Sequence, residues 1–81
     1  MKIEILGSGC AKCNSVEKLV RNIVEELDIQ AEVVKVEDLQ DIINRGIMMT
    51  PAVFIDGEAI IVGRVPSADE LRKLLKEKVI N

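Results

Sequence analysis

The chain has 81 residues, of which 48% are hydrophobic and 31% charged, with a net charge of −3 and a single aromatic residue, Phe54. This composition predicts one small folded domain, residues 1–81, with a core built from Ile, Val and Leu. The sequence has no basic stripe and no aromatic platform, which argues against a nucleic-acid partner. Because Met1-Lys2 leads directly into a strand-like run, we expect no leader segment. No apolar stretch reaches membrane-spanning length, so we expect no membrane partner and a cytoplasmic protein, and we expect it to be a monomer.

The first half of the chain predicts a strand, a helix and a second strand. Residues 2–6 (KIEIL) alternate polar and apolar side chains, as a half-buried strand does. After a break at "GSG", apolar residues recur at helical spacing to about Asp28: Val16, Leu19, Val20, Ile23, Val24 and Leu27. Residues 31–36 (AEVVKV) are rich in β-branched side chains and predict the second strand. Such a strand-helix-strand unit implies a parallel pair with a right-handed crossover.

The middle of the chain predicts a short helix and a hairpin. The helix is expected to begin at residues 37–38 and to end at Gly46. Its apolar residues are expected on one face: Leu39, Ile42 and Ile43. After "MMTP", the runs 52–55 and 58–62 flank an Asp-Gly pair, which is a strong signal for a two-residue hairpin turn.

The last element is predicted to be a helix. The segment "SADE" at residues 67–70 has the spacing of a capping box, and the apolar residues after it continue to about Val79. The order of elements is then strand, helix, strand, helix, strand, strand, helix. We therefore predict an α/β fold in which a four-stranded mixed sheet carries helices on both faces.

The two cysteines, Cys10 and Cys13, form a C-x-x-C motif at the junction between the first strand and the first helix. A helix N-terminus has unpaired N–H groups and a partial positive charge, which favour an anion such as a thiolate. Lys12 adds a nearby cation that favours the thiolate of Cys10 in the same way. Cys13 falls on the apolar stripe of the helix and is expected to be more buried. We therefore predict Cys10 as the nucleophile and Cys13 as the resolving thiol.

The C-x-x-C at a helix start, together with "MMTPAVFIDGEAIIVG" downstream, resembles the thioredoxin superfamily over essentially the whole chain. In size the chain is similar to glutaredoxins and to small redox-active disulfide proteins. The resemblance implies a β-α-β-α-β-β-α thioredoxin-like fold and a thiol-disulfide oxidoreductase that acts on protein disulfides and receives electrons from a reductase. It also implies that Pro51 is a cis proline facing the disulfide and that the backbone of Thr50 pairs with the substrate. Met48 and Met49 beside Pro51 are candidates for lining the substrate groove; the alternative is that they fill the core or the underside of the loop.

The chain departs from the patterns of both related groups. Thioredoxins have an aromatic residue before the first cysteine and Gly-Pro between the pair, where this chain has Gly9 and Ala11-Lys12. Glutaredoxins contact glutathione through basic and glycine-rich segments, whereas this chain has no tyrosine and only Gly63 before Arg64. We therefore do not expect glutathione as a cofactor. We expect no metal and no organic cofactor, with the cysteine pair itself as the redox group.

Two other uses of the cysteine pair stay open at this stage. The segment "GSGCAKCNSVEKLV" also resembles the metal-binding loop of heavy-metal-associated domains, where two thiolates bind Cu(I). Those domains have the order strand-helix-strand-strand-helix-strand, whereas this chain places a helix between Val36 and Pro51 and is expected to end on a helix. The pair could instead be a structural disulfide, but a loop this short stabilises a fold by only about 2 kcal/mol.

Glu4 is the polar residue in the middle of the first predicted strand. It alternates with Ile3 and Ile5, so we expect its side chain to face solvent. The alternative is a buried acid that accepts a proton from Cys13, which is the role of a buried acid in some thioredoxins.

Overall fold

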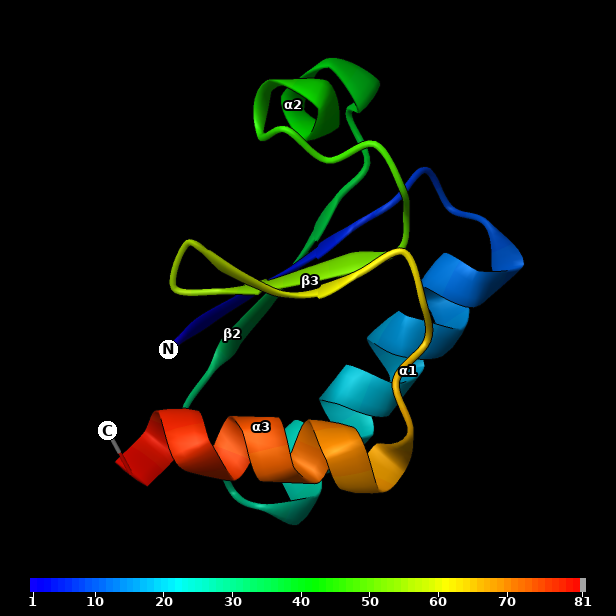
Figure 1. The fold of residues 1–81 in the computed structure, drawn as a ribbon. Coiled ribbons are helices and arrows are strands. Elements are labelled where there is room, and N and C mark those ends of the chain that lie inside the picture. The colour runs from blue at the N-terminus through cyan, green and yellow to red at the C-terminus, as the bar shows by residue number, and fades with distance from the viewer. Residues whose placement is uncertain (81) are drawn as a thin grey trace.

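The structure of the protein is a computed structural model that describes residues 1–80. Within these residues, four strands form one sheet in the order β2-β1-β3-β4 (Figure 1). The elements in chain order are β1 (Lys2–Leu6), α1 (Ala11–Glu26), β2 (Glu32–Val36), α2 (Leu39–Asn44), β3 (Ala52–Ile55), β4 (Glu58–Val62) and α3 (Ala68–Ile80). β1 runs parallel to β2 and antiparallel to β3, and β3 runs antiparallel to β4. The predicted element order and mixed sheet are confirmed.

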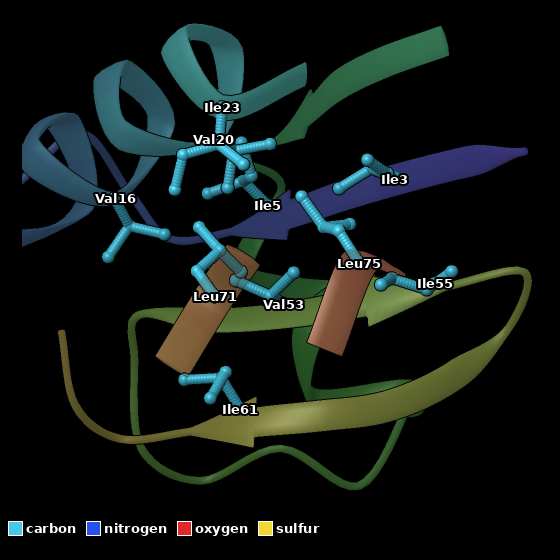
Figure 2. Close-up of a cluster of buried hydrophobic side chains, with 10 residues drawn as sticks. All are labelled: Ile3, Ile5, Val16, Val20, Ile23, Val53, Ile55, Ile61, Leu71 and Leu75. Carbon is cyan, nitrogen blue, oxygen red and sulfur yellow. The ribbon is translucent and has the colours of Figure 1, made fainter. Parts of the chain in front are cut away.

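Helices cover both faces of the sheet, with α1 and α3 on one face and α2 on the other (Figure 1). Side chains alternate along a strand, so Ile3 and Ile5 of β1 turn toward α1 and α3, whereas Leu6 turns toward α2. The larger core lies under α1 and α3 (Figure 2) and consists of Ile3, Ile5, Val16, Val20, Ile23, Val53, Ile55, Ile61, Leu71 and Leu75. As predicted, aliphatic side chains build this core.

α1 ends two residues before the predicted end at Asp28. Asp28 adopts a left-handed backbone conformation with φ of 52°, which the helix cannot continue through. Its own N–H donates to the carbonyl of Glu25 at 3.1 Å, and the N–H of Ile29 donates to the carbonyl of Val24 at 3.0 Å. These two bonds form a Schellman motif, in which Asp occupies the position more often taken by Gly.

α2 differs from its prediction in the side chains that it buries. Asp38 caps the helix as expected, because its Oδ1 accepts a hydrogen bond from the backbone N–H of Gln40 at 2.9 Å. Of the three apolar residues expected on one buried face, only Ile42 packs into the smaller core, while Leu39 and Ile43 are exposed. A helix of six residues is therefore oriented with one apolar position inward and two at the surface.

The prediction that Glu4 faces solvent is wrong. The residue is only 8% exposed, and its Oε2 accepts a hydrogen bond from Nη2 of Arg45 at 2.8 Å. Arg45 also pairs with Asp41 and lies over the ring of Phe54, 5.6 Å from its centroid. The hydrogen bond from Arg45 holds the pKa of the Glu4 carboxyl below its ordinary value. Glu4 thus points to the α2 face, and the helix that carries Cys13 lies on the opposite face.

α3 begins at the predicted capping segment and continues to Ile80, one residue beyond the expected end. Ser67 Oγ accepts a hydrogen bond from the backbone N–H of Glu70 at 3.1 Å, which is one half of a capping box. The carboxylate of Glu70 turns instead to Arg64, at 2.7 Å from its Nη1, and this contact lowers the pKa of Glu70. Over residues 1–80, no helix has the length and apolar character needed to cross a membrane.

Candidate active site

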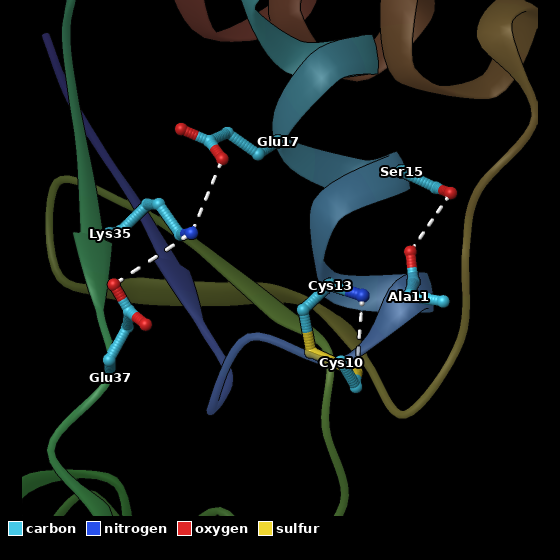
Figure 3. The surroundings of a disulfide bond; sticks show 7 residues. All are labelled: Cys10, Ala11, Cys13, Ser15, Glu17, Lys35 and Glu37. Atoms are coloured by element: carbon cyan, nitrogen blue, oxygen red, sulfur yellow. Dashed lines mark hydrogen bonds and ion pairs between the residues drawn. A yellow bond between two sulfur atoms is a disulfide. The ribbon is translucent and has the colours of Figure 1, made fainter.

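The two cysteines form a disulfide at the N-terminus of α1 (Figure 3). Their Cα atoms lie 5.1 Å apart, within the range of ordinary disulfides. Cys10 is the N-cap residue, and its Sγ accepts a hydrogen bond from the backbone N–H of Cys13 at 3.2 Å. The Cys10 sulfur therefore lies where the helix concentrates unpaired N–H groups and partial positive charge. The first turn of α1 carries no acidic residue that would oppose a thiolate there.

The two sulfurs differ strongly in accessibility. Cys10 is exposed, whereas Cys13 is 1% exposed and continues inward along the stripe that includes Val16 and Val20. Lys12 lies between the cysteines in the chain and is exposed. An incoming molecule can therefore contact Cys10 and Lys12, while Cys13 is covered by the protein.

Charged side chains lie on the β2 side of the disulfide (Figure 3). Lys35 Nζ lies 3.5 Å from Oε1 of Glu17 and 3.8 Å from Oε1 of Glu37, so two carboxylates share one ammonium group. Gly9, just before Cys10, turns with φ of +84°, and a Cβ added there would lie 3.6 Å from Oε2 of Glu37. No local pattern in the sequence indicates this cluster, because Glu17 comes from α1 and the other two charges come from the end of β2.

The segment predicted to bind the substrate lies next to the cysteine pair. The peptide bond between Thr50 and Pro51 is cis, with Thr50 exposed and Pro51 buried. Gly7, at the end of β1, separates this segment from the disulfide: a Cβ added at Gly7 would meet the side chain of Cys13 and would lie 3.8 Å from Cβ of Thr50. The carbonyl of Pro51 accepts a hydrogen bond from the N–H of Gly63 at 2.8 Å, which attaches the segment to the end of β4.

The two methionines before Thr50 lie in different surroundings. Met49 packs beside Gly63, since a Cβ added at Gly63 would lie 3.0 Å from Cβ of Met49. Met48 is 93% exposed and lies on a largely apolar groove of about 400 Å³ that reaches Thr50. The groove is lined by Leu39, Ile42, Ile43, Gly46, Ile47, Met48 and Thr50. Sequence reasoning missed the contribution of α2, because its three apolar residues have the i, i+3, i+4 spacing of one buried face, and nothing in that spacing indicates that two of them stay at the surface.

Comparisons with known proteins agree with this geometry. Residues 1–76 match a family model described as a thioredoxin domain. The chain is 44% identical over 75 residues to a thioredoxin from Methanothermobacter thermautotrophicus, covering 93% of this chain and 97% of that protein. It is 42% identical over 74 residues to a thioredoxin from Methanocaldococcus jannaschii, covering 91% and 85% respectively. The solved structure of thioredoxin 1 from Thermosipho africanus has the same fold, with a TM-score of 0.68, 24% identity and coverage of 98% and 94%.

These findings do not favour a Cu(I) site at the cysteine pair. α2 lies between β2 and β3, which is not the order of elements in heavy-metal-associated domains. With its family match, its curated relatives and its C-x-x-C pair at the start of α1, the chain belongs to the thioredoxin family of thiol-disulfide oxidoreductases.

Proposed function

We propose that Cys10 is the nucleophile and Cys13 the resolving thiol in the reduction of protein disulfides. The difference in exposure between the two sulfurs carries this assignment. An attacking thiolate must reach a sulfur on a bulky substrate, whereas a resolving thiolate needs to reach only the neighbouring cysteine. The helix N-terminus and the exposed ammonium of Lys12 both favour the thiolate form of Cys10.

The reaction begins when the Cys10 thiolate attacks one sulfur of the substrate disulfide. A mixed disulfide forms, and the other substrate sulfur leaves as a thiolate and takes up a proton. The Cys13 thiolate then attacks Sγ of Cys10, forms the intramolecular disulfide and releases the second substrate sulfur. Two electrons pass to the substrate, and a dithiol donor, such as a reductase or dithiothreitol, returns them by the same exchange chemistry. This cycle requires no metal and no organic cofactor.

The overall proposal is tested with dithiothreitol as the electron donor and a folded protein with an accessible disulfide as the substrate. We expect the chain at catalytic concentration to accelerate the reduction well beyond the rate with dithiothreitol alone. After unfolding, the reduced protein should present two thiols to an alkylating reagent, and the oxidised protein none. Absence of acceleration by a protein that does cycle between these two forms would refute a reductase function.

We propose that the substrate backbone binds along Thr50, with Pro51 anchoring that segment and Met49 contributing an exposed apolar contact. Thr50 is exposed, lies next to Gly7, which neighbours Cys13, and also lines the apolar groove. A substrate segment that places its disulfide at Cys10 can therefore place a neighbouring apolar side chain in the groove beside α2. This arrangement would give the protein a preference for disulfides flanked by apolar residues.

Replacing Ile43 with Asp tests the role of the groove. The residue is 54% exposed, so the substitution places a charge at the groove without disturbing the core. We expect kcat/KM for a protein substrate with apolar flanks to fall about tenfold, which corresponds to the loss of one apolar contact. Reduction of a small disulfide, too short to reach the groove, should keep its rate.

Val79→Asp is the matched control, because Val79 is also 54% exposed on a helix and receives the same charge, but it lies near the end of α3. Equal losses in the two variants would attribute the effect to net charge and contradict docking at the groove.

A further inference from the structure

Gly7 occupies the position between the end of β1 and the sulfur of Cys13. We propose that Gly7 is a positioning residue for the redox pair: because it lacks a Cβ, it leaves the space in which the Cys13 sulfur must lie when the disulfide is formed. By this means Gly7 favours the disulfide over the dithiol and makes the pair a stronger reductant. The inference rests on the proposed redox role of Cys10 and Cys13.

The backbone of Gly7 does not itself require glycine. The other four glycines of the chain have positive φ angles, from 76° to 85°, a conformation that other residues rarely adopt. Gly7 is not among them, and its N–H donates to the carbonyl of Val36 at 3.0 Å, which extends the pairing of β1 with β2 by one residue. An alanine could therefore adopt this backbone conformation, and the reason for glycine must lie in the space around it.

That space is taken by the side chain of Cys13. A Cβ built on Gly7 would lie closer than 3.0 Å to Sγ of Cys13 and 3.0 Å from its Cβ. Real Cβ atoms do not approach other heavy atoms more closely than 3.0 Å, so an alanine here must displace the sulfur, the first turn of α1, or the end of β1. Both Gly7 and Cys13 are buried, so while the disulfide is formed neither side chain can move into solvent to relieve the contact.

The two redox states differ in how freely the sulfur can move. In the disulfide, Sγ of Cys13 is bonded to Cys10 and cannot turn about its own Cα–Cβ bond. In the dithiol, that bond is absent and the sulfur can adopt another rotamer. A methyl group at position 7 therefore raises the free energy of the disulfide more than that of the dithiol.

The test is the redox equilibrium between the protein and dithiothreitol. In this reaction, reduced dithiothreitol gives two electrons to the protein disulfide, which yields the protein dithiol and the cyclic disulfide of dithiothreitol. For Gly7→Ala we expect the equilibrium constant to shift toward the protein dithiol by about tenfold, which raises the reduction potential by about 30 mV. Alkylation of free thiols at several reagent ratios measures the constant. An unchanged constant in a folded Gly7→Ala protein would overturn the proposal.

Gly57→Ala is the matched control for general loss of stability. Gly57 lies in the turn between β3 and β4 with φ of +85°, and a Cβ there would meet no atom within 4 Å. This substitution strains the backbone and should lower the free energy of unfolding, but it should leave the equilibrium with dithiothreitol unchanged. An equal shift in both variants would show that the effect of Gly7→Ala is not specific to the sulfur.

If Gly7→Ala does not fold in the oxidised form, the double variant Gly7→Ala/Cys13→Ala provides a second test. Cys13→Ala removes Sγ, so the added methyl group at position 7 should cost clearly less stability in that background than in the oxidised wild type. If the double variant also fails to fold where Cys13→Ala alone folds, the contact with Sγ is not the cause and the proposal is wrong. These measurements are independent of catalysis: a shifted equilibrium without reductase activity would contradict the proposed function but leave the role of Gly7 intact.

Discussion

Cys10→Ser will abolish the reduction of protein disulfides, whereas Cys13→Ser will stop the reaction at a covalent complex between Cys10 and the substrate. A serine hydroxyl remains protonated at neutral pH and does not attack a disulfide, so the first variant loses the opening step. The second variant keeps the exposed sulfur of Cys10 at the start of α1, and the mixed disulfide still forms. It then persists because nothing attacks the Cys10 sulfur from within the protein.

Electrophoresis without reductant, followed by mass measurement, detects the trapped complex, and dithiothreitol should release it. Ala11→Ser is the control, since it introduces a serine at an exposed position of the same helical turn without removing a sulfur. The Ala11 variant should reduce substrate at the wild-type rate and form no lasting complex. A complex formed through Cys13 in the Cys10→Ser variant would reverse the two assigned roles.

Arg45→Met is expected to lower the free energy of unfolding by about 3 kcal/mol at neutral pH. The change removes the partner of a carboxylate that is buried in the sheet, and an unpaired buried charge costs more than the pair contributes. The methionine keeps much of the apolar contact that the arginine stem makes over Phe54. For a chain of 81 residues, a loss of this size is a large part of the total stability.

This loss of unfolding free energy in Arg45→Met should be larger at neutral pH than in acid. Arg45 holds the pKa of Glu4 below its ordinary value of 4.5, so the stabilisation by the pair is complete above that value and is lost as the pH falls through the lower, folded-state pKa. In the Met variant the buried carboxyl can become neutral in acid, where it no longer needs a cation. Urea unfolding of both proteins should therefore show a difference that is largest near pH 7 and shrinks toward pH 3.

Arg21→Met is the control for this prediction. Arg21 pairs with Glu17 across one turn of α1, but its side chain is exposed, and such a pair contributes only about 0.5 kcal/mol or less. Similar losses in the two variants, or a loss for Arg45→Met that does not change with pH, would contradict a buried charge pair at Glu4.

The sequence predicted most of the fold because its signals are local. Alternation in residues 2–6 and helical spacing after Cys13 identify β1 and α1, and the Asp-Gly turn identifies the hairpin. Local patterns do not show what covers the second face of a sheet. The alternation in β1 alone therefore predicts an exposed Glu4, because its partner Arg45 lies 41 positions later, at the C-cap of α2.

The same distinction applies to the site. The cysteine pair is contained in one turn of helix, so its unequal burial could be predicted from the stripe that Val16 and Val20 continue. The space beside Gly7 depends on the packing of the end of β1 against the first turn of α1. The apolar groove depends on how α2 is oriented over the sheet. Neither arrangement leaves a periodic signal in the sequence.

The position of β1 within the sheet has a consequence for the dynamics of the redox pair. β1 is hydrogen-bonded on both sides, to β2 and β3, and the bond from Gly7 to Val36 carries this pairing to within three residues of Cys10. Fraying begins at sheet edges, which here are β2 and β4, and the interior strand opens last. The amide hydrogens of β1 should therefore exchange with solvent at close to the rate of global unfolding. The reactive pair is thus expected to be attached, through Gly7, to the part of the sheet that opens last.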